Sequence, residues 1–205
     1  MSAEAVRRIA TYQDVLDAPE HLVTELVDGD LYASPRPASR HARAGSALGS
    51  LVGSPFDLKR GGPGGWWIID EPEIHLVGDI VVPDLAGWRR ERMPEYPNTP
   101  FFTQAPDWIC EILSPSTARL DRVVKLPLYA RNGVEWAWVI DVEARSLEVF
   151  KLQAGRYTLW QTFSGDEPVP AEPFEAVPWS WGSSGADQPR NSSRTTRLTT
   201  EGRAR

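Results

Sequence analysis

The sequence predicts one mixed α/β (α+β) domain with a central twisted sheet flanked by helices. Short apolar runs bounded by glycine, proline and aspartate recur along the chain and are typical of strands. Nine tryptophans favour a sheet-rich core, while 18 prolines and 16 glycines favour many turns and few long helices. At 205 residues the chain is long enough for one well-buried domain, and nothing in its composition demands a second.

The N-terminal part is predicted to form a short helix and a hairpin. Thr11 is the expected N-cap of the helix, with Asp14 three residues later, and a proline at position 19 follows its end. Two alternating runs then flank Asp28-Gly29, which is the strongest short hairpin signal in the chain. Glu25 lies in the first of these two strands.

Residues 38–53 have the apolar periodicity of a helix, which Gly53 is expected to end. His41 lies in its first turns, where a structural role or a phosphate contact is favoured over metal ligation. Residues 54–65 are polar or glycine and predict a loop. They contain no phosphate-binding GxxxxGK[ST] pattern.

Further strands are predicted at residues 66–70 and within 73–88, with a turn at 77–79. Residues 80–85 are expected to form a buried strand that Asp84 ends. Residues 89–106 contain four prolines, so they predict an exposed, irregular connection able to cover a site. The next buried strand is expected at 108–113.

The C-terminal half predicts a helix and an antiparallel meander. The helix spans 119–131 and is complicated by Pro127, which lacks an amide proton and is tolerated in a first turn. Alternating runs continue the meander from Trp136 to Trp181. The arginine-, serine- and threonine-rich tail, 183–205, is predicted to be disordered because it is almost devoid of apolar residues, which leaves 1–182 as the domain.

The charge balance disfavours a protein that tracks phosphates with a basic surface. The net charge of −6 divides into −9 for the body and +3 for the tail. A polynucleotide substrate would therefore need local arginines and metal ions. The single cysteine excludes an internal disulfide, and neither a leader nor a membrane-spanning run is found, which predicts a cytoplasmic protein and no membrane partner.

Asp84, Glu111 and Lys125 form the main candidate site. Carboxylates are rarely buried unless they are paired or bind a metal, so two of them entering one core from two strands indicate a shared cation. In phosphodiester hydrolysis two carboxylates can hold Mg²⁺ or Mn²⁺, while a lysine orients water or meets the phosphate. Because Leu113 stands two residues after Glu111, the lysine is expected from the following helix.

Several motifs resemble the Uma-two family of restriction-endonuclease-like proteins, from about residue 12 to residue 181. Its pattern is PD, then E-x-L-S-P-S-T, D-x-x-x-K, Y-A-x-x-G-V and W-x-x-D. The matching residues are Pro83-Asp84, Glu111 to Thr117, Asp121 with Lys125, Tyr129-Ala130 with Gly133-Val134, and Trp138 with Asp141. The family belongs to the PD-(D/E)xK nuclease-like superfamily, so the resemblance implies a restriction-endonuclease-like core.

The resemblance also implies an activity and roles for residues. The expected function is a Mg²⁺- or Mn²⁺-dependent endonuclease acting on nucleic acid, with DNA preferred and a homodimer possible. Asp84, Glu111 and Lys125 are the expected catalytic residues. The expected metal ligands are Asp84, Glu111 and, as a supporting ligand, Glu25. Asp121 is expected to cap the helix or to pair with Lys125, and Lys125 to serve the reaction and not the fold.

Two other functions stay open at the level of the sequence. A catalytically silent nucleic-acid-binding or assembly module of the same fold would fit the acidic body. A metal-independent hydrolase would use the two carboxylates as acid and base, although Lys125 and the motifs around it speak against this. Among the tryptophans only Trp88, beside three arginines, is a candidate to face substrate, and packing is favoured even there.

Overall fold

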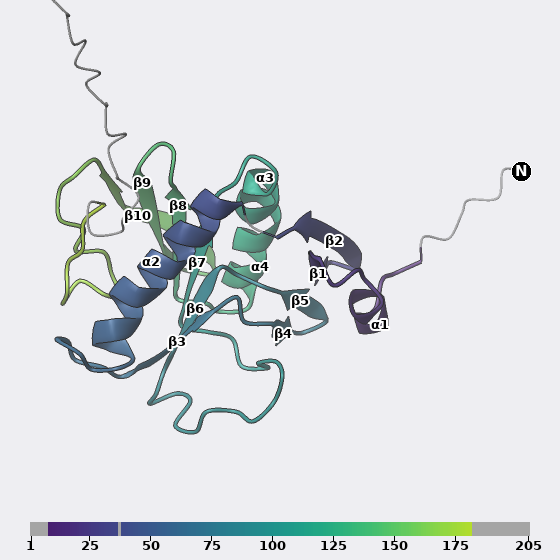
Figure 1. Ribbon diagram of the computed structural model, residues 1–205. Coiled ribbons are helices and arrows are strands. Elements are labelled where there is room, and N and C mark those ends of the chain that lie inside the picture. Colours follow the sequence, from purple (N-terminus) through teal and green to yellow (C-terminus); the bar gives the residue numbers. More distant parts are fainter. Residues whose placement is uncertain (1–7, 37, 182–205) are drawn as a thin grey trace, which may run out of the picture.

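The computed structural model describes residues 8–36 and 38–181, which form two β-sheets and a small number of helices (Figure 1). The larger sheet contains β3 (Trp66–Asp70), β6 (Leu85–Arg89), β7 (Trp108–Ile112), β8 (Trp136–Asp141), β9 (Ser146–Gln153) and β10 (Arg156–Ser164). The smaller sheet contains β1 (Leu22–Val27), β2 (Asp30–Pro35), β4 (Ile74–Leu76) and β5 (Asp79–Val81). The predicted mixed class is confirmed.

Strand order places β7 in the middle of the larger sheet. That sheet runs β10-β9-β8-β7-β6-β3, and the smaller one runs β2-β1-β5-β4. Within the described residues β7 and β8 pair in parallel, whereas the other neighbouring strands are antiparallel. The parallel pair requires a crossover, and the helical segment 118–131 supplies it.

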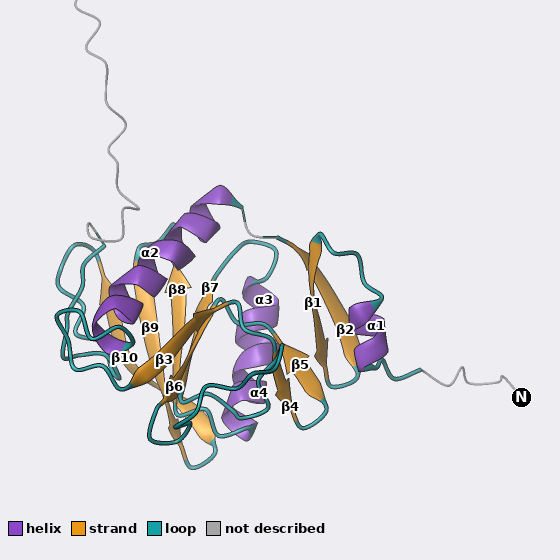
Figure 2. Cartoon of the chain, turned by 60° about the horizontal axis from the view of Figure 1, so that its bottom comes forward, coloured by secondary structure: helices purple, strands orange, loops and turns teal. Residues whose placement is uncertain are grey.

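Helices cover both faces of the larger sheet (Figure 2). On one face lies α2 (Ser39–Phe56), which packs against the tryptophans of β7 and β8. On the other lie α3 (Ala118–Leu120), the π-helical turn η1 (Asp121–Lys125) and α4 (Leu126–Arg131). These residues share a core with the smaller sheet. Alternation along β7 directs Trp108, Cys110 and Ile112 to the first face and Ile109 to the second.

The N-terminal predictions are confirmed. Helix α1 (Tyr12–Leu16) starts at the N-cap Thr11, whose amide donates to Asp14 Oδ2 at 2.8 Å. The hairpin turns at Asp28 and Gly29, which adopt φ values of 51° and 77°. Positive φ at both positions is the type I′ geometry that favours glycine and aspartate.

Helix α2 runs past the predicted end at Gly53. It continues to Phe56 and includes Pro55. The burial of Phe56, whose ring packs on Phe174 at a centroid separation of 4.7 Å, outweighs the amide that Pro55 lacks. The polar loop is shorter than predicted for that reason.

The predicted strand 80–85 is wrong in its extent. Strand β5 ends at Val81, and β6 begins at Leu85 in the other sheet. The chain changes sheets across residues 82–84, where Pro83 has no amide proton to continue a ladder. Asp84 therefore precedes a strand of the larger sheet instead of ending one of the smaller.

Pro127 reshapes the predicted helix 119–131. The segment is helical throughout, but residues 121–125 form a π turn in which the Leu126 amide donates to the Asp121 carbonyl, five residues back. Pro127 cannot donate to the carbonyl four residues before it, and its ring would collide with that carbonyl. The wider turn directly before the proline avoids this conflict.

The irregular connection does not cover the site, and Trp88 packs, as was favoured from the sequence. Residues 90–107 are irregular as predicted, but Met93 and Phe102 are buried in the core on the α4 face, and none of the segment lines the candidate site described below. Trp88 is fully buried and stacks on Phe102, so it packs and does not face substrate.

The meander ends earlier than predicted. After β10 the chain makes a single bridge, Val169 to Trp179, and then packs Trp179 and Trp181 on the α2 face. The predicted disordered tail, 183–205, lies outside the described residues. No helix in the described ranges has the length and apolar character needed to cross a bilayer.

Candidate active site

The candidate site is a cavity of about 330 Å³ between the two sheets and the start of α2. All four residues predicted for the site line it: Glu25 from β1, Asp84 from the crossover between sheets, Glu111 from β7 and Lys125 from η1. Asp121, His41 and Glu71 also line it. Residues distant in sequence thus meet because the chain changes sheets at Asp84 and because the crossover helix packs against both sheets.

Glu111 lies at the centre of this cavity and is 2% exposed. Its Oε1 accepts a hydrogen bond from the Tyr129 hydroxyl at 2.6 Å and contacts Lys125 Nζ at 2.8 Å. For Oε2 no protein partner is found among the described residues. Burial raises the pKa of Glu111 well above its usual value, and the positive charge of Lys125 opposes this rise.

Lys125 bridges two buried carboxylates. Its Nζ lies 2.8 Å from Glu111 Oε1 and 2.8 Å from Glu25 Oε1, and the side chain is 3% exposed. Burial alone would lower the pKa of Lys125, but the two glutamates raise it above its ordinary value. This ammonium group compensates two desolvated charges, which favours a role in the fold beside the expected role in the reaction.

Asp84 is fixed by the end of β7. Its Oδ2 accepts the Ile112 amide at 2.7 Å, and Oδ1 has no protein partner in the part of the chain that the structure describes. Glu111 likewise keeps one oxygen bound and one oxygen without a partner. The two predicted metal ligands thus line the same cavity, each with one oxygen for which no partner is found among the described residues.

His41 joins Asp84 to the backbone of β7. Its Nε2 is 2.6 Å from the Ile112 carbonyl oxygen and 3.4 Å from Asp84 Oδ2. A carbonyl only accepts, so Nε2 carries the proton. Burial alone would lower the pKa of His41, but Asp84 and the carbonyl raise it above its usual value. The histidine contacts the site directly, which the sequence pattern did not specify.

Asp121 faces the cavity and does not cap a helix. Thr117 is the N-cap, and Asp121 begins the π turn with its Oδ1 3.8 Å from Lys125 Nζ, so the predicted pairing at i, i+4 is confirmed. Burial raises the pKa of Asp121 to about 6, although Lys125 and Thr117 act in the opposite direction.

The donor set fits a small divalent cation with water in its coordination sphere. No group of three or more His, Cys, Asp or Glu side chains within residues 8–36 and 38–181 is arranged to enclose a metal ion. Mg²⁺, however, is usually held by one or two carboxylates together with water and phosphate oxygens. Asp84 and Glu111 meet that requirement. Glu25 lines the same cavity and stays a supporting candidate, since only its Oε1 contacts Lys125 and accepts the Val82 amide.

The net negative charge of the cavity also favours a bound cation. Five carboxylates, from Glu25, Glu71, Asp84, Glu111 and Asp121, line the cavity together with Lys125 and Arg36, and three of the five are buried. Like charges gathered in a desolvated cavity repel one another unless they are protonated or meet a cation. Burial is the main cause of the raised pKa values of Glu111 and Asp121, and the neighbouring carboxylates add to it.

Tyr129 is the residue that sequence reasoning missed. Its fully buried hydroxyl fixes the Oε1 atom of Glu111, and its ring packs in the core between α4 and the sheet. The Y-A-x-x-G-V motif contains Tyr129, but the motif alone did not indicate a contact with Glu111. A search for a hydrogen-bond donor able to reach a buried glutamate could have found it.

Of the comparisons with known proteins, one shows the family and another shows the fold. Residues 9–181 match the family described as “Uma2: Putative restriction endonuclease”. Among solved structures, one from Anabaena variabilis, described as a “putative nuclease belonging to DUF820”, is similar with a TM-score of 0.70 and 23% identity. The match covers 85% of this chain and 97% of that one, and it establishes the fold. Comparison with curated proteins finds no match.

Proposed function

Because the chain belongs to the Uma2 family, described as putative restriction endonucleases, we propose that it is an endonuclease that hydrolyses phosphodiester bonds of nucleic acid with Mg²⁺ or Mn²⁺. DNA is the preferred substrate in this proposal. The observation that carries it is the pair Asp84 and Glu111, each with one oxygen held by the protein and one without a protein partner in the described residues, lining one cavity.

Asp84 and Glu111 would hold the ion, which when bound activates water and offsets the charge of the phosphate. Their geometry is set before substrate arrives, because the Ile112 amide fixes Asp84 and the Tyr129 hydroxyl fixes Glu111. Such preorganisation matters because it leaves little reorganisation for the moment of reaction.

Lys125 has two functions in this proposal. It offsets the repulsion between Glu25 and Glu111, and it places a positive charge beside the cavity where a phosphate would lie. Hydrolysis adds a water oxygen to phosphorus and breaks the bond to the leaving oxygen. One proton leaves the attacking water and one reaches the leaving oxygen.

Cleavage of labelled DNA and RNA, with Mg²⁺ or Mn²⁺ and with a chelator, tests the proposal. We expect Glu111→Gln and Asp84→Asn each to lower the metal-dependent rate by a factor on the order of 10² or more. Glu73→Gln is the matched control, since Glu73 is a partly buried carboxylate that binds Tyr12 and His75 outside the cavity. It should cleave like the wild type.

The outcomes separate the candidate functions. Cleavage that persists in the chelator would identify a metal-independent hydrolase. If the folded wild type cleaves neither polymer with either metal, the catalytically silent binding module is the better description of this chain.

A further inference from the structure

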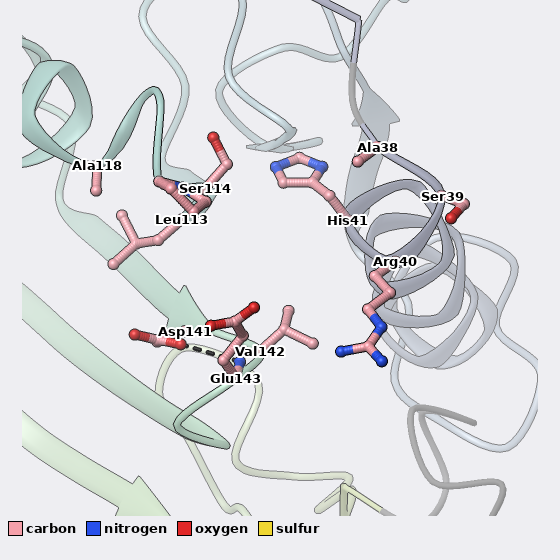
Figure 3. A pocket seen from close by; sticks show the side chains of 11 residues that line it. Ala38, Ser39, Arg40, His41, Leu113, Ser114, Ala118, Asp141, Val142 and Glu143 are labelled. Carbon is pink, nitrogen blue, oxygen red and sulfur yellow. Dashed lines mark hydrogen bonds between the residues drawn. The ribbon is translucent and has the colours of Figure 1, made fainter. Parts of the chain in front are cut away.

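A second cavity, of about 470 Å³, adjoins the candidate active site (Figure 3). The two cavities share Ala38, His41, Ser114 and Pro115, so His41 stands between them. The volume lies within the range of small-molecule sites and is concave, which suits one flat group rather than the side of a duplex. None of the roles proposed above uses this cavity.

The lining of the second cavity has three chemically different parts. Arg40, from the first turns of α2, lies on one side. Asp141, the last residue of β8, and Glu143, from the turn that follows it, lie on the opposite side (Figure 3). The apolar part of the wall is formed by Val142, between the acidic residues and Arg40, and by Leu113 with Ala118 (Figure 3). Asp141 Oδ1 accepts the Glu143 and Ala144 amides, which fixes the acidic side.

The arginines at this end of α2 are available to a ligand. No ion pair is found for Arg40 or Arg43 in the described part of the chain. By contrast, three arginines at the end of β6 and directly after it are each paired with an acidic residue: Arg89, Arg90 and Arg92. An unpaired guanidinium at a cavity mouth is well suited to a phosphate group, which it can bind through two parallel hydrogen bonds.

We propose that the second cavity binds one unpaired nucleotide next to the bond that is cleaved. Arg40 binds its phosphate, and Leu113 and Val142 contact the face of its base. Asp141 and Glu143 accept hydrogen bonds from an exocyclic amine. Cytosine, adenine and guanine can donate such hydrogen bonds, whereas thymine has no amine. Because a base inside a duplex cannot enter a cavity, the substrate has an unpaired nucleotide there. The inference rests on the proposed function and narrows its substrate.

Binding without cleavage tests this inference separately from the nuclease activity. Fluorescence anisotropy in a chelator would compare labelled oligo-dA, oligo-dC and oligo-dT, their RNA counterparts and a blunt duplex. We expect wild type to bind the amine-bearing strands roughly fivefold or more tightly than oligo-dT, and the duplex most weakly. Comparing each DNA strand with its RNA counterpart shows whether the cavity prefers a deoxyribonucleotide or a ribonucleotide.

Two variants assign the preference to the cavity. Glu143→Gln, at an exposed position, and the isosteric Asp141→Asn should each reduce the preference for amine-bearing strands, with melting temperatures near that of the wild type. Arg40→Ala should instead weaken the binding of all strands alike. It should also reduce the salt dependence of the affinity by the amount expected for about one phosphate contact. The controls are Glu95→Gln and Arg156→Ala, two exposed residues that do not line the cavity.

Equal binding of all strands, or a preference that survives both acidic substitutions, would overturn the inference. So would a duplex that binds as tightly as the single strands. If strands bind selectively but nothing is cleaved with metal, the cavity assignment holds and the nuclease proposal fails. If the wild type cleaves with metal but shows no base preference, the nuclease proposal holds and the cavity assignment fails.

Discussion

At the scale of single residues, the burial of Lys125 makes it a structural cation as well as a candidate for catalysis. Lys125→Met should lower the free energy of unfolding at neutral pH by about 3–5 kcal/mol, because it leaves Glu25 and Glu111 buried without their shared partner. Urea denaturation measures this loss. Adding Glu25→Gln to the same chain should restore part of it, since one of the two uncompensated charges is then removed.

Lys151→Met is the control for Lys125→Met. Lys151 lies over the rings of Trp136 and Trp160 at 4.5 and 4.8 Å and has no buried carboxylate partner in the described residues. Its substitution should cost no more than about 1 kcal/mol. Equal losses for the two variants would show that Glu25 and Glu111 are not charged in the folded protein.

The raised pKa of Asp121 predicts that the stability of the protein depends on pH in metal-free buffer. Its pKa is raised by burial to about 6, above that of an unfolded aspartate. The contribution of this group to stability is therefore fully present below the unfolded pKa and is lost as pH rises through about 6. Asp121→Asn removes the effect, so its melting temperature relative to that of the wild type should be higher at pH 8 than at pH 4.5. A constant difference across this range would contradict the assignment.

The residues of the site were predictable in part. Asp84 and Glu111 could be identified because carboxylates in apolar runs are anomalous, and Lys125 through the resemblance. The contacts of His41 and Tyr129 could not be predicted, since each joins elements whose relative placement is a tertiary property. A periodicity describes one element and does not specify which other element packs on it.

At the scale of secondary-structure elements, β6 packs too tightly for a larger residue at its centre. A methyl group on Gly87 would lie 3.0–3.2 Å from Ile68, Trp108 and Trp66. Gly87→Ala should therefore destabilise the protein by about 1–3 kcal/mol. Thermal or urea unfolding measures the change.

Gly53→Ala is expected to change the stability in the opposite direction to Gly87→Ala. Gly53 lies inside α2, and nothing would lie within 4 Å of an added methyl group. Alanine is favoured over glycine in a helix by up to about 1 kcal/mol, so this variant should be more stable than the wild type. If both alanine variants lost stability equally, the packing around Gly87 would not explain its effect.

The elements themselves were largely predictable, and their exceptions have local causes. Hairpin β1–β2 and strand β7 follow from turn chemistry and alternation. The π turn at 121–125 was not predicted, although Pro127 indicated some irregularity. The strand 80–85 was misassigned because an apolar run does not reveal where a chain leaves one sheet for another.

At the scale of the whole molecule, the excess of carboxylates predicts that divalent cations stabilise the fold. Melting temperatures should rise with Mg²⁺ or Mn²⁺, because an ion bound by the folded state alone shifts unfolding to higher temperature. Glu111→Gln should lose this shift while keeping or raising the melting temperature in chelator. Glu73→Gln, whose carboxylate lies outside the cavity, should keep the shift.

The central claim is that Asp84 and Glu111 share one divalent cation, although they come from a crossover between sheets and from β7. Crystals grown with Mn²⁺ and measured for anomalous scattering test it most directly. The account predicts a manganese peak in the cavity, bonded to an oxygen of each residue, and no such peak in Glu111→Gln crystals. A peak bound elsewhere, or a cavity that stays empty at millimolar Mn²⁺ with Lys125 between the glutamates, would contradict it.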